Sequence, residues 1–146
     1  MSLRVYLAAP FFSESQVERE EAVKSKLRDE GFMVFSPKEF CHLESDATEE
    51  RRKAVFKSNL RAMDVSDFIL AITDEKDMGT IWESGYAYAR YIPVIYFCET
   101  LKGGKFNLML AESGHGVIEK REDINFQNIA KILTNIYPSG YKGEIE

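Results

Sequence analysis

The chain has 146 residues, of which 45% are hydrophobic and 29% charged, and its formal net charge is −5. This length and composition predict one soluble globular domain over residues 1–146 and exclude a disordered chain. The negative charge excludes nucleic-acid polymers as general partners, and no apolar run is long enough to span a bilayer.

The first third of the chain indicates a strand, a helix and a second strand. Residues 4–9 form an apolar run without regular alternation, which is typical of a strand buried on both faces of a parallel sheet. The spacing of apolar residues after Ser13 predicts a helix of about fifteen residues, with Gly31 as its stop signal. Residues 32–35 then form a second short strand.

The middle of the chain continues this alternation after a long connection. Residues 38–47 are polar and rich in turn formers, which predicts an irregular loop that is functional or mobile. Helical spacing returns over residues 48–63, where Thr48 is placed to cap the helix. Residues 67–73 are the clearest buried strand of the chain.

The last part of the chain predicts a helix over 80–90, a strand over 93–97, a short helix from Asn107, a fifth strand near Val117 and an amphipathic helix over 126–136. Strands that alternate with helices predict a parallel sheet with right-handed crossovers. The expected fold class is therefore α/β, with a flavodoxin-like open parallel sheet of about five strands and helices on both faces.

Neither the cysteines nor the histidines have the spacing of metal ligands. Cys41 and Cys98 lie far apart without a CxxC pattern, so we expect no disulfide, no zinc site and a reducing, cytoplasmic location. His42 and His115 also lack ligand spacing, and no functional role is expected for either.

Ligands of open parallel sheets bind beyond the carboxyl ends of the strands. The loops after Ala9, Thr73 and Phe97 are therefore the expected places for functional residues. The loop after Thr73 continues into a helix and carries two carboxylates, Asp77 and Glu83, that bracket a Gly-Thr turn. Of the three loops, this one carries the side chains that are most able to take part in a reaction.

The segment between these two carboxylates has the features of a helix start. Gly79 allows the backbone to approach a ligand closely, and Thr80 is expected to cap the helix. Glu83 would then lie in the first turn, where the helix dipole favours an ionised carboxylate. Such a group can act as a nucleophile at an anomeric carbon, but the spacing also fits an acid that only complements the dipole.

Four stretches of the sequence carry a family resemblance: VYLAAPFF at 5–12, SNLRAMDVSDFIL at 58–70, DMGTIWESGYAYA at 77–89 and FNLML at 106–110. In this order they resemble the nucleoside 2-deoxyribosyltransferase family, and D-x-G-x-x-x-E-x-G-Y-A is the most specific element. The resemblance implies transfer of 2-deoxyribose between nucleobases through a covalent deoxyribosyl-Glu intermediate. The implied partners are a 2'-deoxynucleoside and a free nucleobase, with no metal or organic cofactor.

The resemblance also implies roles for individual residues. Glu83 matches the nucleophile, and Tyr6 matches the tyrosine that orients it. Asp77 matches an acid that contacts the 5'-hydroxyl group, and its charge would repel a phosphate, so nucleosides are expected over nucleotides. Asn107 matches an asparagine that reaches into a neighbouring subunit's active site, which implies a homo-oligomer with a shared site. As a plain helix cap, Asn107 would need no partner.

Asn59 departs from the family pattern. An aspartate usually occupies this position, where it helps to hold the sugar and to protonate the leaving base. An amide cannot deliver a proton at neutral pH. Either another acid serves, with Asp64 and Asp74 the nearest in sequence, or leaving bases that are protonated from solvent are preferred, or turnover is slow.

The residues that bind the base are expected after the first two strands. Pro10, Phe11, Phe12 and Phe40 offer flat apolar surface there for a purine or pyrimidine. Two other functions remain open. One is an N-glycoside hydrolase of deoxynucleosides or their 5'-monophosphates, and the other is a nucleoside-binding module without catalysis.

Overall fold

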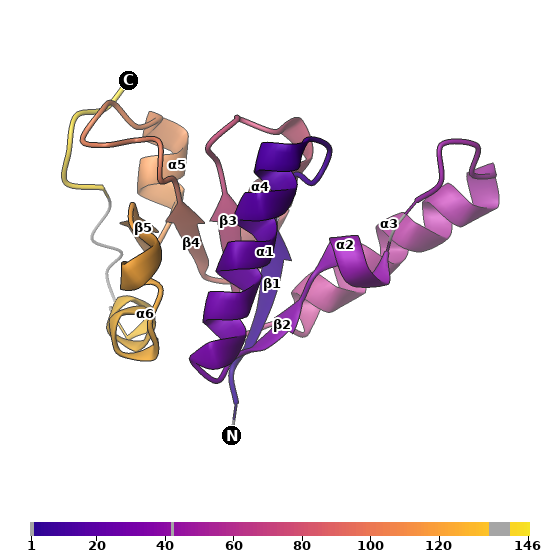
Figure 1. Cartoon of the computed structure of the whole chain (residues 1–146), viewed down its shortest axis with the longest axis horizontal. Helices are drawn as coiled ribbons and strands as arrows, with labels where there is room; N and C mark the ends of the chain where they lie inside the picture. The colour runs from indigo at the N-terminus through magenta and orange to yellow at the C-terminus, as the bar shows by residue number, and fades with distance from the viewer. Residues whose placement is uncertain (1, 42, 135–140) are drawn as a thin grey trace.

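The computed structural model describes residues 2–41, 43–134 and 141–146, and it contains a five-stranded parallel sheet (Figure 1). In chain order the elements are β1 (Arg4–Ala8), α1 (Glu14–Asp29), β2 (Met33–Phe35), α2 (Pro37–Phe40), α3 (Glu49–Asp64), β3 (Phe68–Ile72), α4 (Met78–Ala89), β4 (Val94–Phe97), α5 (Leu108–Ser113), β5 (Gly116–Ile118), the 3-10 helix η1 (Arg121–Asp123) and α6 (Phe126–Leu133). The strand order β2-β1-β3-β4-β5 is that of flavodoxin-like sheets, so the predicted fold class is confirmed.

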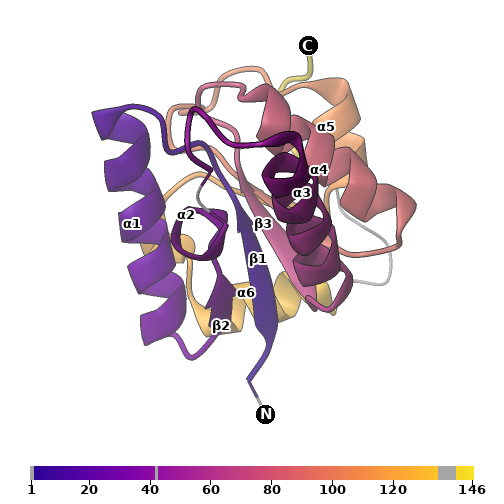
Figure 2. The ribbon, with the colours of Figure 1, turned by 90° about the vertical axis from the view of Figure 1, so that its right-hand side faces the viewer.

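Helices cover both faces of the sheet (Figures 1 and 2). On one face α1 and α6 pack against alternate strand residues, and on the other face α3, α4 and α5 do so. The register places Tyr6 of β1 between Phe35 of β2 and Ile69 of β3. Because side chains alternate along a strand, the Tyr6 ring lies on the face covered by α3 and α4, where the pocket described below is found.

Two of the predicted elements differ from the structure, and a third reaches beyond the described residues. The loop predicted over 38–47 begins with a short helix, α2, because Pro37 occupies the first helical position, where its fixed backbone angle favours a helix. The helix predicted from Thr80 begins two residues earlier. The helix predicted over 126–136 is seen to Leu133, and the end of that range lies outside the described residues. None of the described helices is both long and apolar enough to cross a membrane.

Helix α3 is attached to the sheet at its C-terminal end. Its buried residues are Ala62 and Met63 in the last turn, while its N-terminal half extends beyond the sheet (Figure 1). The Thr48 side chain accepts a hydrogen bond of 3.1 Å from the Arg51 amide, which confirms the predicted cap. The N-terminal half of α3 therefore forms one side of the space beside the carboxyl ends of the first strands.

A buried ion cluster joins α1 to the segment that follows β2. The Lys24 ammonium lies 3.2 Å from Oε1 of Glu20 and 2.9 Å from carboxylate oxygens of both Glu21 and Glu39. Glu20 also accepts a hydrogen bond from the hydroxyl group of Ser36, the residue before α2. Helical spacing alone did not single out Glu20 and Lys24, although both are buried.

Replacing Lys24 by methionine should lower the free energy of unfolding by about 3 kcal/mol, because it leaves the buried Glu20 carboxylate without its cation. Urea unfolding measures the change. Lys53→Met is the matched control, since Lys53 pairs with Glu49 on the exposed surface of α3. Such surface pairs contribute about 0.5 kcal/mol. Equal losses in both variants would contradict a structural role for the cluster.

Candidate active site

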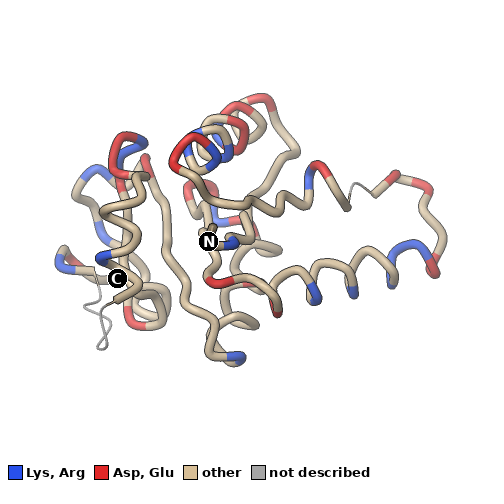
Figure 3. Tube along the Cα trace, turned by 90° about the horizontal axis from the view of Figure 1, so that it is seen from below, with Lys and Arg blue, Asp and Glu red and all other residues tan. Residues whose placement is uncertain are grey.

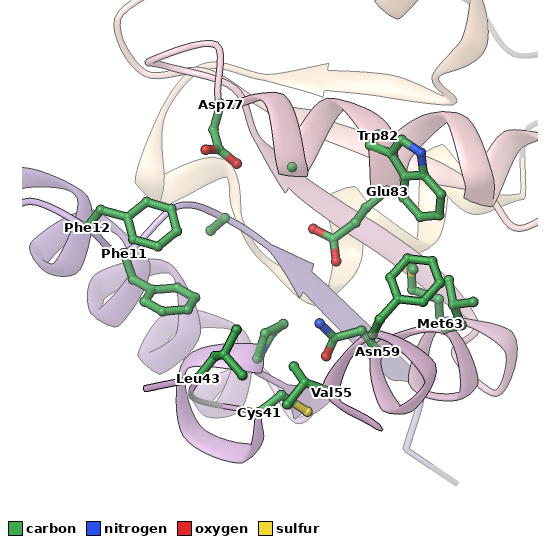
Figure 4. Close-up of a pocket in the computed structure, with 15 residues that line it drawn as sticks. Phe11, Phe12, Cys41, Leu43, Val55, Asn59, Met63, Asp77, Trp82 and Glu83 are labelled. Atoms are coloured by element: carbon green, nitrogen blue, oxygen red, sulfur yellow. The ribbon is translucent and has the colours of Figure 1, made fainter. Parts of the chain in front are cut away.

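A pocket of about 690 Å³ lies between α3 and the start of α4, at the carboxyl ends of the first strands (Figure 4). Its lining comes from the loop after β1, the segment after β2, α3 and α4. The described lining residues are Ala9, Phe11, Phe12, Pro37, Cys41, Leu43, Val55, Phe56, Asn59, Leu60, Met63, Asp77, Gly79, Trp82 and Glu83. Two of the three loops expected to matter, those after Ala9 and Thr73, thus contribute to one pocket.

Glu83 is held by a fully buried tyrosine beneath the pocket. The Tyr6 hydroxyl group donates a hydrogen bond to Oε2 of Glu83. Burial raises the pKa of Glu83 to about 7, the Tyr6 hydrogen bond opposes that rise, and the nearby Asp77 charge adds to it. Burial and the Glu83 charge raise the pKa of Tyr6 as well, so the phenol keeps its proton and remains a donor.

The start of α4 differs from the prediction. Asp77, not Thr80, caps the helix, and its Oδ2 accepts hydrogen bonds of 2.9 Å from the Thr80 amide and 3.0 Å from the Thr80 hydroxyl group. Glu83 therefore lies in the second turn, not the first. Since the dipole acts mainly within the first turn, burial and Tyr6 govern the ionisation of Glu83.

Gly79 leaves room for the Asp77 carboxylate. A Cβ atom at this position would lie 3.2 Å from Oδ2 of Asp77, which is tighter than ordinary contact. Gly79 also lines the pocket itself. Because Gly79 has no side chain, the first turn of α4 can accommodate the capping carboxylate and also line the pocket.

The aromatic residues after β1 lie across the pocket from Glu83 (Figure 4). The ring centroids of Phe11 and Phe12 are 5.1 Å apart, and Phe12 is 77% exposed. Pro10 is buried and is not one of the described lining residues. Phe40 is not one of them either, and its ring stacks on Phe35 instead.

Asn59 projects from α3 and faces Glu83 across the pocket, with its amide nitrogen toward the carboxylate (Figure 4). Its Oδ1 is buried and has no hydrogen-bond partner. An unsatisfied buried acceptor is unfavourable, and such groups often mark functional sites. The structure therefore gives this amide no role in holding the fold together through Oδ1.

Asp64 and Asp74, the acids nearest in sequence to position 59, have other partners. Asp64 accepts a hydrogen bond of 2.9 Å from the Tyr86 hydroxyl group. Asp74 accepts one of 2.8 Å from the Thr100 amide, and its other oxygen lies 3.6 Å from Arg19. Neither aspartate is among the described lining residues.

Asn107 lies away from Glu83 within one chain. Its Oδ1 caps α5 by accepting hydrogen bonds of 2.9 Å and 3.3 Å from the amides of Met109 and Leu110. It lines a separate pocket of about 450 Å³ with residues that include Thr73. Its predicted contact with a neighbouring subunit remains a prediction.

Two half-exposed aromatic residues also line the pocket. Neither was predicted from the sequence to belong to the site. Phe56 of α3 and Trp82 of α4 have ring centroids 5.5 Å apart, and Trp82 stacks on Tyr86 at 5.7 Å. The helical spacing of Val55, Phe56 and Met63 was visible in the sequence. Periodicity does not distinguish a face that lines a pocket from one that packs into a core, so the signal was incomplete.

The charged groups of the pocket are the Asp77 and Glu83 carboxylates, and none of the described lining residues is basic. Lys and Arg recur along α3 (Figure 3), where Lys53, Lys57 and Arg61 are exposed. Nor do the described residues bring three His, Cys, Asp or Glu side chains close enough to hold a metal ion. The pocket therefore disfavours anionic ligands, and its aromatic surface and carboxylates can receive a ligand that has a flat apolar part and hydrogen-bond donors.

Replacing Tyr6 by phenylalanine should raise the pKa of Glu83 further above about 7, because the Tyr6 hydrogen bond stabilises the ionised carboxylate. Carbon-13 NMR of the labelled carboxyl group measures this titration. Tyr88→Phe is the control, since Tyr88 is an exposed residue of α4 and its loss should leave the titration unchanged. An unchanged or lower pKa in Tyr6→Phe would show that the hydrogen bond does not favour the ionised form.

Comparison with known proteins points to one family. A family model described as nucleoside 2-deoxyribosyltransferase matches residues 5–125. A 2-deoxyribosyltransferase from Bacillus psychrosaccharolyticus is 33% identical, with 94% of this chain and 98% of that chain covered and a TM-score of 0.80. No match was found among curated proteins.

Two more distant solved structures share the fold. A conserved protein from Enterococcus faecalis is 19% identical over 90% of this chain and 99% of its own, with a TM-score of 0.72. A CMP N-glycosidase from Clostridium botulinum is 20% identical over 82% of this chain and 91% of its own, with a TM-score of 0.51. At these identities the likeness concerns the fold alone.

Proposed function

The chain belongs to the nucleoside 2-deoxyribosyltransferase family, and we propose that it moves 2-deoxyribose between nucleobases through a covalent intermediate on Glu83. The observation that carries the proposal is the Tyr6–Glu83 hydrogen bond at a pocket that also presents Asp77. A carboxylate that is held in place and shielded from water can bond to an anomeric carbon.

In the first step an ionised Glu83 oxygen attacks C1' of the bound nucleoside from the face opposite the base. The C1'–N bond breaks as the new C1'–O bond forms, through a transition state with positive charge on the sugar. Tyr6 keeps the carboxylate aimed at the pocket, because its own proton is retained.

In the second step another base gives up its N–H proton to water and its nitrogen attacks the same carbon atom, so that the C1'–O bond breaks and Glu83 is released as a free carboxylate. Both bases use the same part of the pocket in turn, and we assign that part to the aromatic surface of Phe11 and Phe12. Pro10, which precedes these rings in the chain, is buried and gives no such surface. The carboxylate supplies the covalent chemistry, so the proposed reaction uses no cofactor.

The sugar is held at its 5' end by Asp77, which accepts a hydrogen bond from the 5'-hydroxyl group. The carboxylate keeps this role while its Oδ2 caps α4, since each oxygen accepts more than one hydrogen bond. No basic residue among the described lining would neutralise a phosphate. The proposed substrates are therefore nucleosides, not their 5'-monophosphates.

The proposed enzyme is a homo-oligomer in which Asn107 of one subunit completes the site of the next. Within one chain Asn107 lies in a separate pocket, on the other side of the β3–α4 connection. A second chain would be needed to bring this amide to the 5' end of the sugar.

Hydrolysis is a second candidate function, and Asn59 is the observation that favours it. Without an acid at this position the departing base receives less help, and water can replace a poorly activated acceptor base. The reaction would then release free deoxyribose from the same Glu83 intermediate.

Incubation with deoxyinosine and adenine separates these functions. Formation of deoxyadenosine supports the transferase, whereas free deoxyribose without a new nucleoside supports the hydrolase. A ligand-induced rise in Tm without either product would indicate a binding module and would overturn the proposed reaction.

A further inference from the structure

We propose that this enzyme releases the base as an anion, which Asn59 stabilises by a hydrogen bond and which no protein acid protonates. The inference rests on the proposed function and names its favoured substrates: 2'-deoxynucleosides whose bases are good leaving groups. In such substrates Asn59 is the group that assists the departing base.

The first support is the set of titratable side chains around the pocket. Among the described lining residues, those groups belong to Glu83, Asp77 and Cys41. Glu83 is the nucleophile and cannot also be the acid. The Cys41 thiol is directed to the Ser58 hydroxyl group, 3.5 Å away.

Asp77 is also in the wrong place to protonate the base. Its carboxylate is engaged at the start of α4, where Oδ2 accepts two hydrogen bonds from Thr80. Figure 4 shows Asp77 at the start of α4, across the pocket from Asn59. Asp64 and Asp74 are engaged outside the described lining.

The second support is the placement of Asn59. Its amide nitrogen faces the Glu83 carboxylate across the pocket (Figure 4). In the proposed attack, C1' has to lie in front of that carboxylate. An amide N–H there can donate to the acceptor atom two bonds from the glycosidic nitrogen, which is O2 of a pyrimidine or N3 of a purine. Its unpartnered Oδ1 indicates that the amide is not committed to another partner through that atom.

The charge balances without a protein acid. As the Glu83 oxygen bonds to C1', the electron pair of the C1'–N bond moves onto the base nitrogen. Glu83 becomes a neutral ester, and the base carries the negative charge that the carboxylate had. Asn59 stabilises this charge by its hydrogen bond, and water protonates the base after it leaves the pocket.

A base that leaves as an anion makes the rate sensitive to its acidity. If the charge is fully developed in the transition state, each unit of lower pKa of the leaving base raises the rate by up to about tenfold. A base that is protonated as it leaves shows little such dependence. The acidity of the leaving base thus distinguishes the two routes.

The experiment measures release of the first base in a single turnover from 2'-deoxyuridine, thymidine and 5-fluoro-2'-deoxyuridine. We expect 5-fluorouracil to leave fastest and thymine slowest. Asn59→Leu should slow all three by about 10- to 100-fold, which is the effect of one hydrogen bond to a charged group. Lys57→Ala, an exposed change on the same helix, should have no effect.

Asn59→Asp is the complementary variant, because a carboxylic acid can deliver a proton. It should accelerate thymidine more than the fluorinated substrate and so reduce the dependence on acidity. Equal rates for the three bases in the wild type, or no effect of Asn59→Leu, would overturn the proposal. If no base is released from any nucleoside, the proposed function itself fails.

His42 lies between two lining residues in the sequence and outside the described residues, so it is tested directly. His42→Ala should leave the dependence on base acidity unchanged. If the wild type shows equal rates and His42→Ala makes them depend on acidity, the imidazole is the proton donor and the proposal is wrong.

Discussion

Replacing Glu83 by glutamine should abolish base exchange, with kcat lowered by at least about 10⁴-fold. The amide has nearly the same shape but is a poor nucleophile, and it lacks the charge that stabilises an oxocarbenium-like centre. The measurement is deoxyadenosine formation from deoxyinosine and adenine. Intact-mass analysis of acid-quenched mixtures should detect a deoxyribosyl adduct on the wild type and none on Glu83→Gln.

Two controls make this loss specific. Glu112→Gln changes an exposed acid of α5 and should leave exchange unaffected. The Tm of Glu83→Gln at pH 8 should not be lower than that of the wild type, because burial raises the pKa of Glu83 and so disfavours its charge in the folded state. Full exchange activity in Glu83→Gln would show that another group attacks the sugar.

Replacing Asp77 by asparagine should weaken the preference for nucleosides over their 5'-monophosphates by about 10- to 100-fold. The carboxylate and a phosphate repel each other by several kcal/mol in a shielded site, and an amide removes that repulsion. Asparagine caps helices about as well as aspartate, so α4 should keep its start. The measurement is kcat/KM for deoxyuridine and for its 5'-monophosphate.

The matched control for this change is Asp123→Asn, which removes one negative charge from an exposed position in η1. It should alter neither value of kcat/KM. An unchanged preference in Asp77→Asn would mean that the 5' end of the substrate does not lie against Asp77.

The sequence predicted the parts of the fold that follow from local pattern. Residues 67–73 and 93–97 are short apolar runs bounded by polar residues, and both contain buried strands of the sheet. Because ligands of open parallel sheets bind beyond the carboxyl ends of the strands, the sequence also indicated the loop that carries Asp77 and Glu83. Tyr6 was placed with Glu83 by family resemblance, since strand pattern alone makes a buried tyrosine a core residue.

Other features depend on contacts that a pattern does not encode. Asp77 and Thr80 are both good caps, and the choice between them moves Glu83 from the first turn of α4 to the second. Phe56 and Trp82 are about half exposed, and each has the chemistry of a core residue. Lys24 looks like an ordinary surface lysine until the segment after β2 brings Glu39 to it.

Because α3 is attached to the sheet by its last turn, the range of bases that the pocket holds can be changed at the other end of the helix. The residues of α3 that pack into the sheet are Ala62 and Met63, whereas Val55 and Phe56 face the pocket nearer the free end. Libraries that vary those two positions would remodel the mouth for bulkier bases while the folding core stays as it is. In this protein, selection for new nucleoside analogues can thus act on one helix end without a large loss of stability.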